Sequence, residues 1–344
     1  MTRALLTGGT GFIAAHILDQ LLQKGHSVVT TARTPEKATS IHAAHPDVGP
    51  DRLQTVVVPD AAIPGAFDMA VQAASDIEVV LHTASPFHFH AVDIQRDLID
   101  PAVGGTCGLL RSIVAHAPQV RRFVLTSSAG AMMDIDKLDK PATTFDETSW
   151  NPMTLADVTN GTSDAIRGYL LSKTLSERLS WDFVAEKQPN FDLVSINPPM
   201  VFGPILHPLA AINTSNERIH NAISGVWKRN NCVPDPGVSV DWVDVRDVAA
   251  VHVLAGLERP AAGGMRLLAA APGQYDNRAI LDIIRDNFPK YGDRLPDRSV
   301  LGGDKGNKRY RIENHATNAL LDMKWRSLEE CVVDTVHSLE KYVD

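Results

Sequence analysis

The chain has 344 residues, 44% of them hydrophobic and 22% charged, which is typical of a globular protein with one large domain or two closely joined domains. Its net charge of -8 and pI of about 5.9 argue against a nucleic-acid partner, which would need a basic surface. We find no apolar stretch long enough to cross a bilayer, no signal-peptide pattern and no cysteine framework, so we expect a cytoplasmic protein without a membrane partner.

The first half of the chain alternates short β-branched runs with helical patterns. Strands are predicted at residues 3–7, 27–32, 53–59, 79–82 and 122–127, and helices at residues 11–25, 35–44, 66–75 and 98–116. This alternation implies a parallel sheet covered by helices on both faces, and right-handed crossovers make it doubly wound. The predicted fold class is therefore α/β, a Rossmann-type doubly wound parallel sheet with a smaller, interwoven C-terminal domain.

The second half is less regular. Residues 132–163 are polar and rich in turns, and the Asn-Gly-Thr-Ser-Asp run at 160–164 predicts the start of a helix at residues 165–187. Further strands are expected at 191–196 and 240–245, and helices at 215–228 and 248–257. No linker separates two halves. We therefore predict a larger domain of residues 1–195 plus 239–270 and a smaller domain of residues 196–238 plus 271–344, with the substrate in the cleft between them.

A glycine turn follows the first predicted strand. Residues 5–14 read Leu-Leu-Thr-Gly-Gly-Thr-Gly-Phe-Ile-Ala, so a strand, a turn and a helix start follow one another. Gly8 permits the tight turn, Gly11 lets the backbone approach a pyrophosphate, and the helix start supplies N–H groups. The alternative is an ordinary strand-to-helix turn. Its place in the first βαβ unit favours a dinucleotide site.

The end of the second strand indicates which dinucleotide is bound. An NAD site needs a carboxylate there, but this chain has Arg33, with Lys37 one helical turn later. Cationic side chains at this point neutralise a 2′-phosphate, so we expect NADP(H) in the larger domain. Asp60 closes the third strand, where it could accept a hydrogen bond from the adenine amine or simply form a turn.

Tyr169 and Lys173 lie four residues apart on a predicted helix and so share a face. An ammonium beside a phenol lowers the phenol pKa from about 10, and the tyrosine can then exchange a proton with a carbonyl oxygen. Ser127 and Ser128 end the fifth strand, at the edge where such sheets place their ligands. A Tyr-x-x-x-Lys pair also occurs by chance on many helices, so it gains meaning only beside the nucleotide fold and the serine pair.

These features resemble the extended short-chain dehydrogenase/reductase family, and the branch that contains dihydroflavonol reductases, cinnamoyl-CoA reductases and the yeast methylglyoxal and aldehyde reductases. The resemblance spans nearly the whole chain. It rests on the motifs at residues 7–14, 32–33, 82–86, 124–128, 146–152, 169–173, 197–204 and 243–249. Pro199-Met200 departs from the pattern of many relatives in the pocket wall.

The resemblance implies a catalytic set of Ser128, Tyr169 and Lys173, with Ser127 as the alternative serine. It also implies that Lys173 binds the nicotinamide ribose and that Pro198 and Val201 pack near the nicotinamide. The expected cofactor contacts are Gly8, Thr10, Gly11, Phe12, Ile13, Arg33, Lys37, Asp60, Ala61, Thr83, Ala84, Ser85, Tyr169, Lys173, Pro198 and Val201.

The pocket for the substrate is expected to include Phe87, Met133, Met200 and Trp227, although each of these could instead be a core residue. His82, His88 and His90 form a histidine-rich stretch, but no acidic or cysteine companion can be placed beside them, so no metal is expected.

The sequence predicts NADPH-dependent reduction of a ketone or aldehyde to the alcohol by a monomer or homodimer, with a small-molecule carbonyl compound as its partner. The alternative is a sugar-nucleotide epimerase or dehydratase that retains NAD, and Arg33 in place of a carboxylate speaks against it. A third hypothesis, a nucleotide sensor without catalysis, conflicts with the intact Ser128, Tyr169 and Lys173 set.

Overall fold

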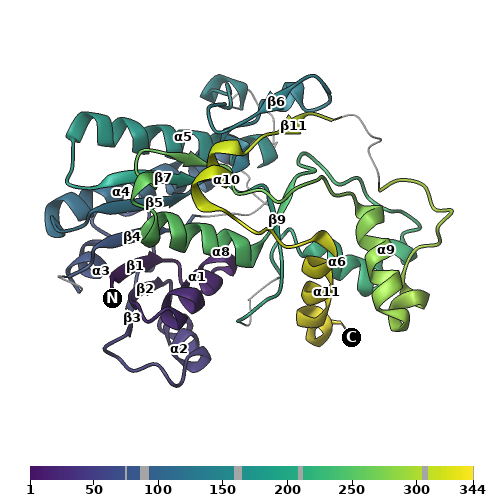
Figure 1. The fold of residues 1–344 in the computed structure, drawn as a ribbon, viewed down its shortest axis with the longest axis horizontal. Coiled ribbons are helices and arrows are strands. Elements are labelled where there is room, and N and C mark those ends of the chain that lie inside the picture. Colours follow the sequence, from purple (N-terminus) through teal and green to yellow (C-terminus); the bar gives the residue numbers. More distant parts are fainter. Residues whose placement is uncertain (74–75, 86–92, 159–164, 208–211, 304–308, 344) are drawn as a thin grey trace.

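The computed structural model describes residues 1–73, 76–85, 93–158, 165–207, 212–303 and 309–343. Within these residues a seven-stranded sheet has the order β10-β7-β5-β4-β1-β2-β3, and all neighbours are parallel (Figure 1). The predicted α/β, doubly wound class is confirmed. The strands are β1 Arg3–Thr7, β2 Ser27–Ala32, β3 Leu53–Val57, β4 Val79–His82, β5 Arg122–Thr126, β7 Asp192–Ile196 and β10 Arg266–Leu267. The strand order reverses direction at β1 and β4, where such sheets open a ligand crevice at their carboxyl edge.

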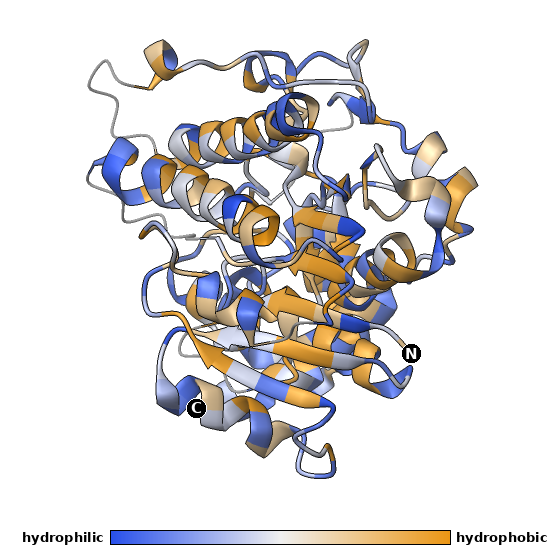
Figure 2. Cartoon of the chain, turned by 90° about the vertical axis from the view of Figure 1, so that its left-hand side faces the viewer, coloured by the Kyte–Doolittle hydropathy of each residue, from blue (hydrophilic) through white to orange (hydrophobic). Residues whose placement is uncertain are grey.

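Helices cover both faces of the sheet. Successive strand residues point to opposite sides, so apolar side chains on both faces are buried under helices. Ala4 and Leu6 of β1 join the core under α1 Phe12–Gln23, α2 Pro35–Ala44 and α8 Val245–Val253. Leu5 points the other way, into the core under α3 Asp68–Gln72, α4 Asp100–His116 and α5 Ala165–Lys187. Figure 2 shows the strands as a mainly hydrophobic block between these helices. The near-continuous apolar strands of the sequence therefore reflect burial on both sides.

The stretch Gln95–His116 corrects one expectation from the sequence. By length and composition alone, this stretch is long and apolar enough to cross a membrane. The expectation that the chain has no such apolar stretch is therefore wrong. Half of its most apolar part is buried, α4 packs against α3 and α5, and the core helix of a soluble protein meets the same criterion. Its apolar character is thus explained by packing, and the absence of a membrane partner stays a prediction.

A second core lies beside the sheet and is built from helices α6 Glu217–Ile223, α7 Val226–Arg229, α9 Asn277–Asn287 and α11 Leu328–Leu339. The single helix predicted at 215–228 is wrong: Gly225 has a φ of 78° and separates α6 from α7. A helix cannot continue through this left-handed conformation, and glycine adopts it at little cost.

The strand predicted at 240–245 is shorter, β9 Trp242–Asp244, and it does not join the large sheet. It pairs in parallel with β8 Met200–Phe202, which the sequence analysis assigned to the smaller domain. The large sheet is completed instead by β10, which was not predicted. One strand from each predicted domain thus contributes to a shared pair, and the domain boundaries stay a prediction.

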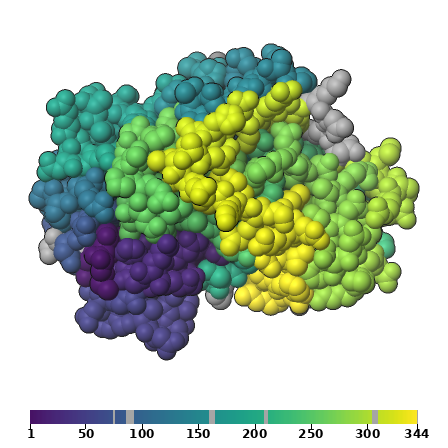
Figure 3. Space-filling view, in the orientation of Figure 1, coloured from purple at the N-terminus to yellow at the C-terminus, as the bar shows by residue number. Residues whose placement is uncertain are grey.

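The C-terminal part of the chain returns across the molecule. β11 Arg311–Ile312 pairs with β6 Thr144–Phe145, α10 His315–Leu321 follows, and α11 packs into the second core. Figure 3 shows this segment, in yellow, running over one face from the sheet side to the helical side. The remaining helical turns are short: Gln95–Ile99, Ala129–Ala131, Ile135–Lys137, Leu155–Asp157, Leu254–Glu258, Pro260–Ala262, Pro289–Arg294 and Glu340–Tyr342.

Candidate active site

The glycine turn lies between β1 and α1 at the carboxyl edge of the sheet. Gly8 has a φ of 74°, and a Cβ on it would lie 3.2 Å from the Cα of Ala84. Gly11 is the N-cap of α1 and has no side chain, so no side chain accepts a hydrogen bond from the first N–H groups of the helix. Backbone this close to β4, with an uncapped helix start, suits a bound pyrophosphate.

Thr7 fastens the end of β4 to the glycine turn. Its hydroxyl oxygen accepts hydrogen bonds from the backbone N–H groups of Thr83 (3.2 Å) and Ala84 (3.1 Å) and is bonded to Nδ1 of His82 (2.8 Å). Nε2 of His82 meets the Thr106 hydroxyl at 3.3 Å. Burial, and then the charge of Lys173, lower the pKa of His82 to about 3, so the ring is neutral and structural.

The end of β2 carries positive side chains. Arg33 is exposed, and Thr34 caps α2 by accepting from the Lys37 N–H at 3.3 Å. No carboxylate lies among the last residues of β2. Asp60 accepts from the Ala62 N–H at 2.9 Å in a local turn, and the carbonyl of Ala61 lies against Gly105 of α4. The arrangement presents a cation where the 2′-hydroxyl of an NAD ribose would meet an acid.

The three predicted catalytic residues come together at the carboxyl end of β5. Tyr169 and Lys173 lie on α5, with Nζ of Lys173 6.0 Å from the centre of the Tyr169 ring. The side chains of Ser128 and Tyr169 are hydrogen-bonded to each other. Ser128 Oγ also accepts from the Gly130 N–H at 3.0 Å, and Lys173 Nζ donates to the Thr126 carbonyl at 3.3 Å.

The two serines at the end of β5 have different partners. Ser127 donates to Oε2 of Glu177 at 2.6 Å and is held in a buried network. Ser128 faces Tyr169 instead. Adjacent residues at a strand end point to opposite sides, so only one of them can face the tyrosine. This geometry favours Ser128 as the serine that would contact a carbonyl oxygen.

Burial changes both titrating groups of the site. It lowers the pKa of Lys173 to about 8, against the opposing charge of Glu177. It also raises the pKa of Tyr169, against the opposing hydrogen bond from Ser128. The predicted lowering of the Tyr169 pKa by Lys173 is therefore wrong for this structure, in which burial raises that pKa. The phenol is protonated at neutral pH and can donate a proton.

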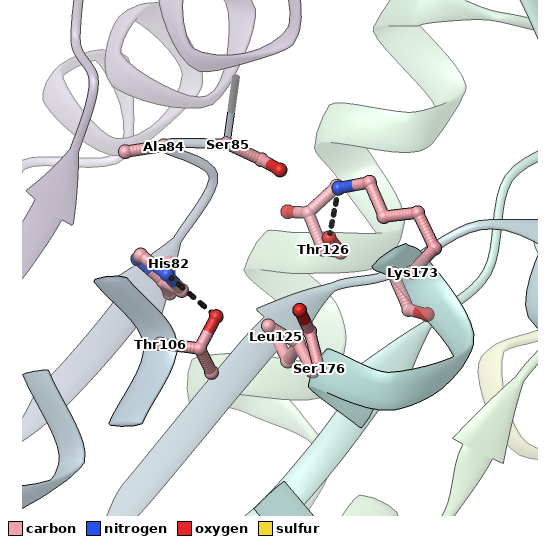
Figure 4. Close-up of a pocket in the computed structure, with 9 residues that line it drawn as sticks. His82, Ala84, Ser85, Thr106, Leu125, Thr126, Lys173 and Ser176 are labelled. Atoms are coloured by element: carbon pink, nitrogen blue, oxygen red, sulfur yellow. Dashed lines mark hydrogen bonds between the residues drawn. The ribbon is translucent and has the colours of Figure 1, made fainter. Parts of the chain in front are cut away.

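A small, partly open cavity adjoins Lys173 (Figure 4). Figure 4 shows Lys173 and Thr126 on one side of it and His82 and Thr106 on the other. Ala84, Ser85, Leu125, Ser127 and Ser176 complete the lining. The cavity lies between the ends of β4 and β5, one strand away from the β1–β4 pair at which the strand order reverses.

The remaining predicted cofactor contacts lie beside Ser128, on β8, at the start of α1 and in the glycine turn. The Pro198 carbonyl accepts from the Ala129 N–H at 3.0 Å, next to Ser128, and Val201 is on β8. Phe12 and Ile13 begin α1, where they pack against the small core that includes Val201. Thr10 lies in the glycine turn.

Of the four predicted substrate contacts, the three within the described residues differ in how far their side chains are exposed. Met200 is half-buried at the start of β8, whereas Met133 is 5% exposed and Trp227 4% exposed within core clusters, which favours packing roles for those two. Phe87, like His88 and His90, lies outside the described residues. In the described residues no three His, Cys, Asp or Glu side chains are grouped to hold a metal ion, and the absence of a metal stays a prediction.

Three further residues of the site were not predicted from the sequence: Glu177, Asn197 and Arg266, which form the buried network behind the serine pair. Glu177 follows Lys173 by four residues, so its place on the same face of α5 as Tyr169 and Lys173 could have been inferred. Asn197 and Arg266 carry no comparable signal, since they meet Glu177 only through the folded sheet.

The model of the NAD dependent epimerase/dehydratase family matches residues 4–266. The chain belongs to this family, and the resemblance to extended short-chain dehydrogenase/reductases is confirmed.

Its relatives include several reductases. The chain is 41% identical to the ketoreductase azaE of Aspergillus niger, over 98% of this chain and 97% of that protein. It is 34% identical to the NADPH-dependent methylglyoxal reductase GRE2 of Saccharomyces cerevisiae, over 98% of each chain. Its structure resembles that of the yeast methylglyoxal/isovaleraldehyde reductase Gre2 complexed with NADPH, with a TM-score of 0.88 and 33% identity over 99% of each chain.

Proposed function

We propose that this chain is an NADPH-dependent carbonyl reductase that converts a ketone or an aldehyde to the alcohol. The observation that carries the proposal is the meeting of Ser128, Tyr169 and Lys173 at the sheet edge that also holds the glycine turn. The similarity to a ketoreductase and to NADPH-dependent methylglyoxal reductases supports the same reaction class.

The residues at this edge fit the cofactor. A Cβ at Gly8 would press on Ala84, so the turn keeps the backbone bare where a pyrophosphate would lie. Arg33 and Lys37 would hold the 2′-phosphate, and Thr83, Ala84 and Ser85 would border the cofactor at the end of β4. Lys173 would bind the nicotinamide ribose. The bound cofactor would supply the hydride.

The protein's own part is to hold the carbonyl oxygen and to protonate it. Ser128 would donate a hydrogen bond to that oxygen and direct it to the phenol. As the carbonyl carbon accepts hydride, the Tyr169 hydroxyl transfers its proton to the oxygen, which gives the alcohol and a phenolate. The Lys173 ammonium stabilises that phenolate until a proton from solvent restores the phenol.

The epimerase or dehydratase alternative is less well supported. Such enzymes retain NAD, whose ribose calls for an acid at the end of β2, and this chain presents Arg33 there. A sensor without catalysis would have no use for the assembled Ser128, Tyr169 and Lys173 set.

The test is oxidation of NADPH and of NADH by the purified protein with aldehydes, diketones, keto-esters and aryl ketones. We expect turnover with NADPH for at least one class and a clear preference for NADPH over NADH. Protein that carries NAD through a desalting column and oxidises neither cofactor would overturn the proposal in favour of the epimerase class.

The two serines provide a matched pair of substitutions. Ser128→Ala is expected to lower kcat about 100-fold because a donor to the carbonyl oxygen is lost. Ser127→Ala is expected to lower kcat less but to lower the free energy of unfolding by about 1–3 kcal/mol, because it leaves the buried Glu177 carboxylate one donor short. Steady-state kinetics and urea unfolding of both variants separate the effects. The reverse pattern would assign the carbonyl contact to Ser127.

We also propose a small-molecule carbonyl compound as the substrate, no nucleic-acid or membrane partner, and a monomer or homodimer in the cytoplasm. The net charge of -8 supports the absence of a nucleic-acid partner. Size-exclusion chromatography with light scattering measures the oligomeric state.

A further inference from the structure

Glu177 is a carboxylate that the proposed reaction does not use, and it lies in the interior directly behind the site. It has no exposed surface and follows Lys173 by one helical turn on α5. Its two oxygens accept hydrogen bonds from three other parts of the sheet: Ser127 Oγ at 2.6 Å after β5, Ser195 Oγ at 2.8 Å on β7, Asn197 Nδ2 at 2.7 Å after β7 and Arg266 Nε at 2.6 Å on β10. A buried carboxylate with so many donors is held in one place.

Arg266 balances the charge of Glu177 and is itself fixed. Its guanidinium donates to the carbonyls of Glu147 (3.1 Å) and Ser149 (2.5 Å) and stacks 3.7 Å from the centre of the Trp150 ring. The Asp-Glu-Thr-Ser-Trp-Asn-Pro motif at residues 146–152 thus has a physical role in the structure. It contacts and orients the Arg266 guanidinium, which pairs with Glu177.

Two connections run from Glu177 to the groups that would react. Asn197 Nδ2 bridges Oε2 of Glu177 (2.7 Å) and the carbonyl of Ser128 (3.0 Å), so it fixes the peptide that carries the catalytic serine. The second connection is electrostatic: the charge of Glu177 favours the ammonium of Lys173, which burial disfavours. One buried carboxylate is therefore linked to both Ser128 and Lys173.

We propose that Glu177 is a positioning residue of the active site. Through Asn197 it sets the place of Ser128, and through its charge, one helical turn from Lys173, it favours the ammonium of that lysine. Arg266 and Trp150 hold the carboxylate in the orientation that does both. The kinetic part of this inference rests on the proposed carbonyl reduction.

The direct test is Glu177→Gln, which keeps the shape of the side chain and removes its charge. We expect kcat to fall about 10- to 100-fold, because the Ser128 peptide shifts relative to the phenol. Without the neighbouring negative charge the pKa of Lys173 falls further, so the ammonium is lost at a lower pH. The alkaline limb of the pH profile of kcat/KM should therefore move to lower pH by about one unit.

Two further variants separate positioning from charge. Asn197→Ala removes the bridge to Ser128 but leaves the carboxylate, so it should lower kcat and leave the alkaline limb in place. Glu177→Asp keeps the charge and should restore much of the alkaline limb. Glu186→Gln, at an exposed carboxylate on the same helix, is the matched control and should change neither quantity.

The affinity for NADPH, measured by fluorescence at several pH values, gives a readout that needs no turnover. In Glu177→Gln, tight binding should be lost at a lower pH than in the wild type. This shift would support the role of Glu177 even if no carbonyl compound were reduced, in which case only the proposed function would fail. A folded Glu177→Gln variant with wild-type kcat, pH profile and NADPH binding would overturn the inference. If that variant does not fold, wild-type kcat in Asn197→Ala would overturn the positioning role.

Discussion

Replacement of Tyr169 by phenylalanine is expected to lower kcat for carbonyl reduction about 1000-fold. The change removes the hydroxyl that is hydrogen-bonded to Ser128 and leaves the ring in place. The alkoxide that forms as hydride arrives then has no positioned proton donor. Steady-state oxidation of NADPH, with fluorescence titration of NADPH binding alongside, tests this expectation. The Kd for NADPH should change less than about threefold, since mutations that remove only a transition-state contact act on kcat.

The matched control is Tyr342→Phe, at a half-buried tyrosine of the C-terminal turn far along the chain from α5. It should keep wild-type turnover. Near-normal turnover in Tyr169→Phe would mean that another group donates the proton and that the assigned acid is wrong.

Reversal of the charge at Arg33 is expected to exchange the cofactor preference. In Arg33→Glu the carboxylate repels a 2′-phosphate and can accept a hydrogen bond from the 2′-hydroxyl of NADH. The ratio of kcat/KM for NADPH to that for NADH should fall by about 100- to 1000-fold, which corresponds to about 3–4 kcal/mol. Initial rates with each cofactor at saturating carbonyl substrate measure the ratio.

Arg311→Glu reverses the same charge at an exposed position on β11 and should leave that ratio unchanged. In the wild type, NADPH binding should also weaken with added salt more than NADH binding does, because a partly exposed ion pair is screened. An unchanged cofactor ratio in Arg33→Glu would place the 2′-phosphate elsewhere.

Much of the sheet was predictable because its strands are buried on both faces and bounded by clear turns. The strands at residues 3–7, 27–32 and 79–82 match the structure in full. β10 was missed because it is only two residues long and follows two glycines, so it has no pattern of its own. The break at Gly225 was missed because apolar residues continue on both sides of it, and only the positive φ reveals it.

The candidate site was predictable where its residues are close in sequence. Tyr169 and Lys173 follow from the helical repeat, and the glycine turn follows from its place after β1. The choice between Ser127 and Ser128 depends on which way each side chain points at a strand end, and the structure supplies that orientation. The raised pKa of Tyr169 depends on burial by the whole fold, so a pairwise argument from Lys173 gave the wrong direction.

The position of β10 affects how the protein is made. A ribosome adds about 5–20 residues per second, so the 70 residues from Asn197, just after β7, to Arg266 take about 4 to 14 s to synthesise. During that time the edge of β7 has no neighbouring strand, and an unpaired edge can recruit another nascent chain. The same residue, Arg266, starts the closing strand and pairs with Glu177. The ion pair between α5 and β10 can therefore form only after residue 266 has been synthesised and β10 has paired with β7.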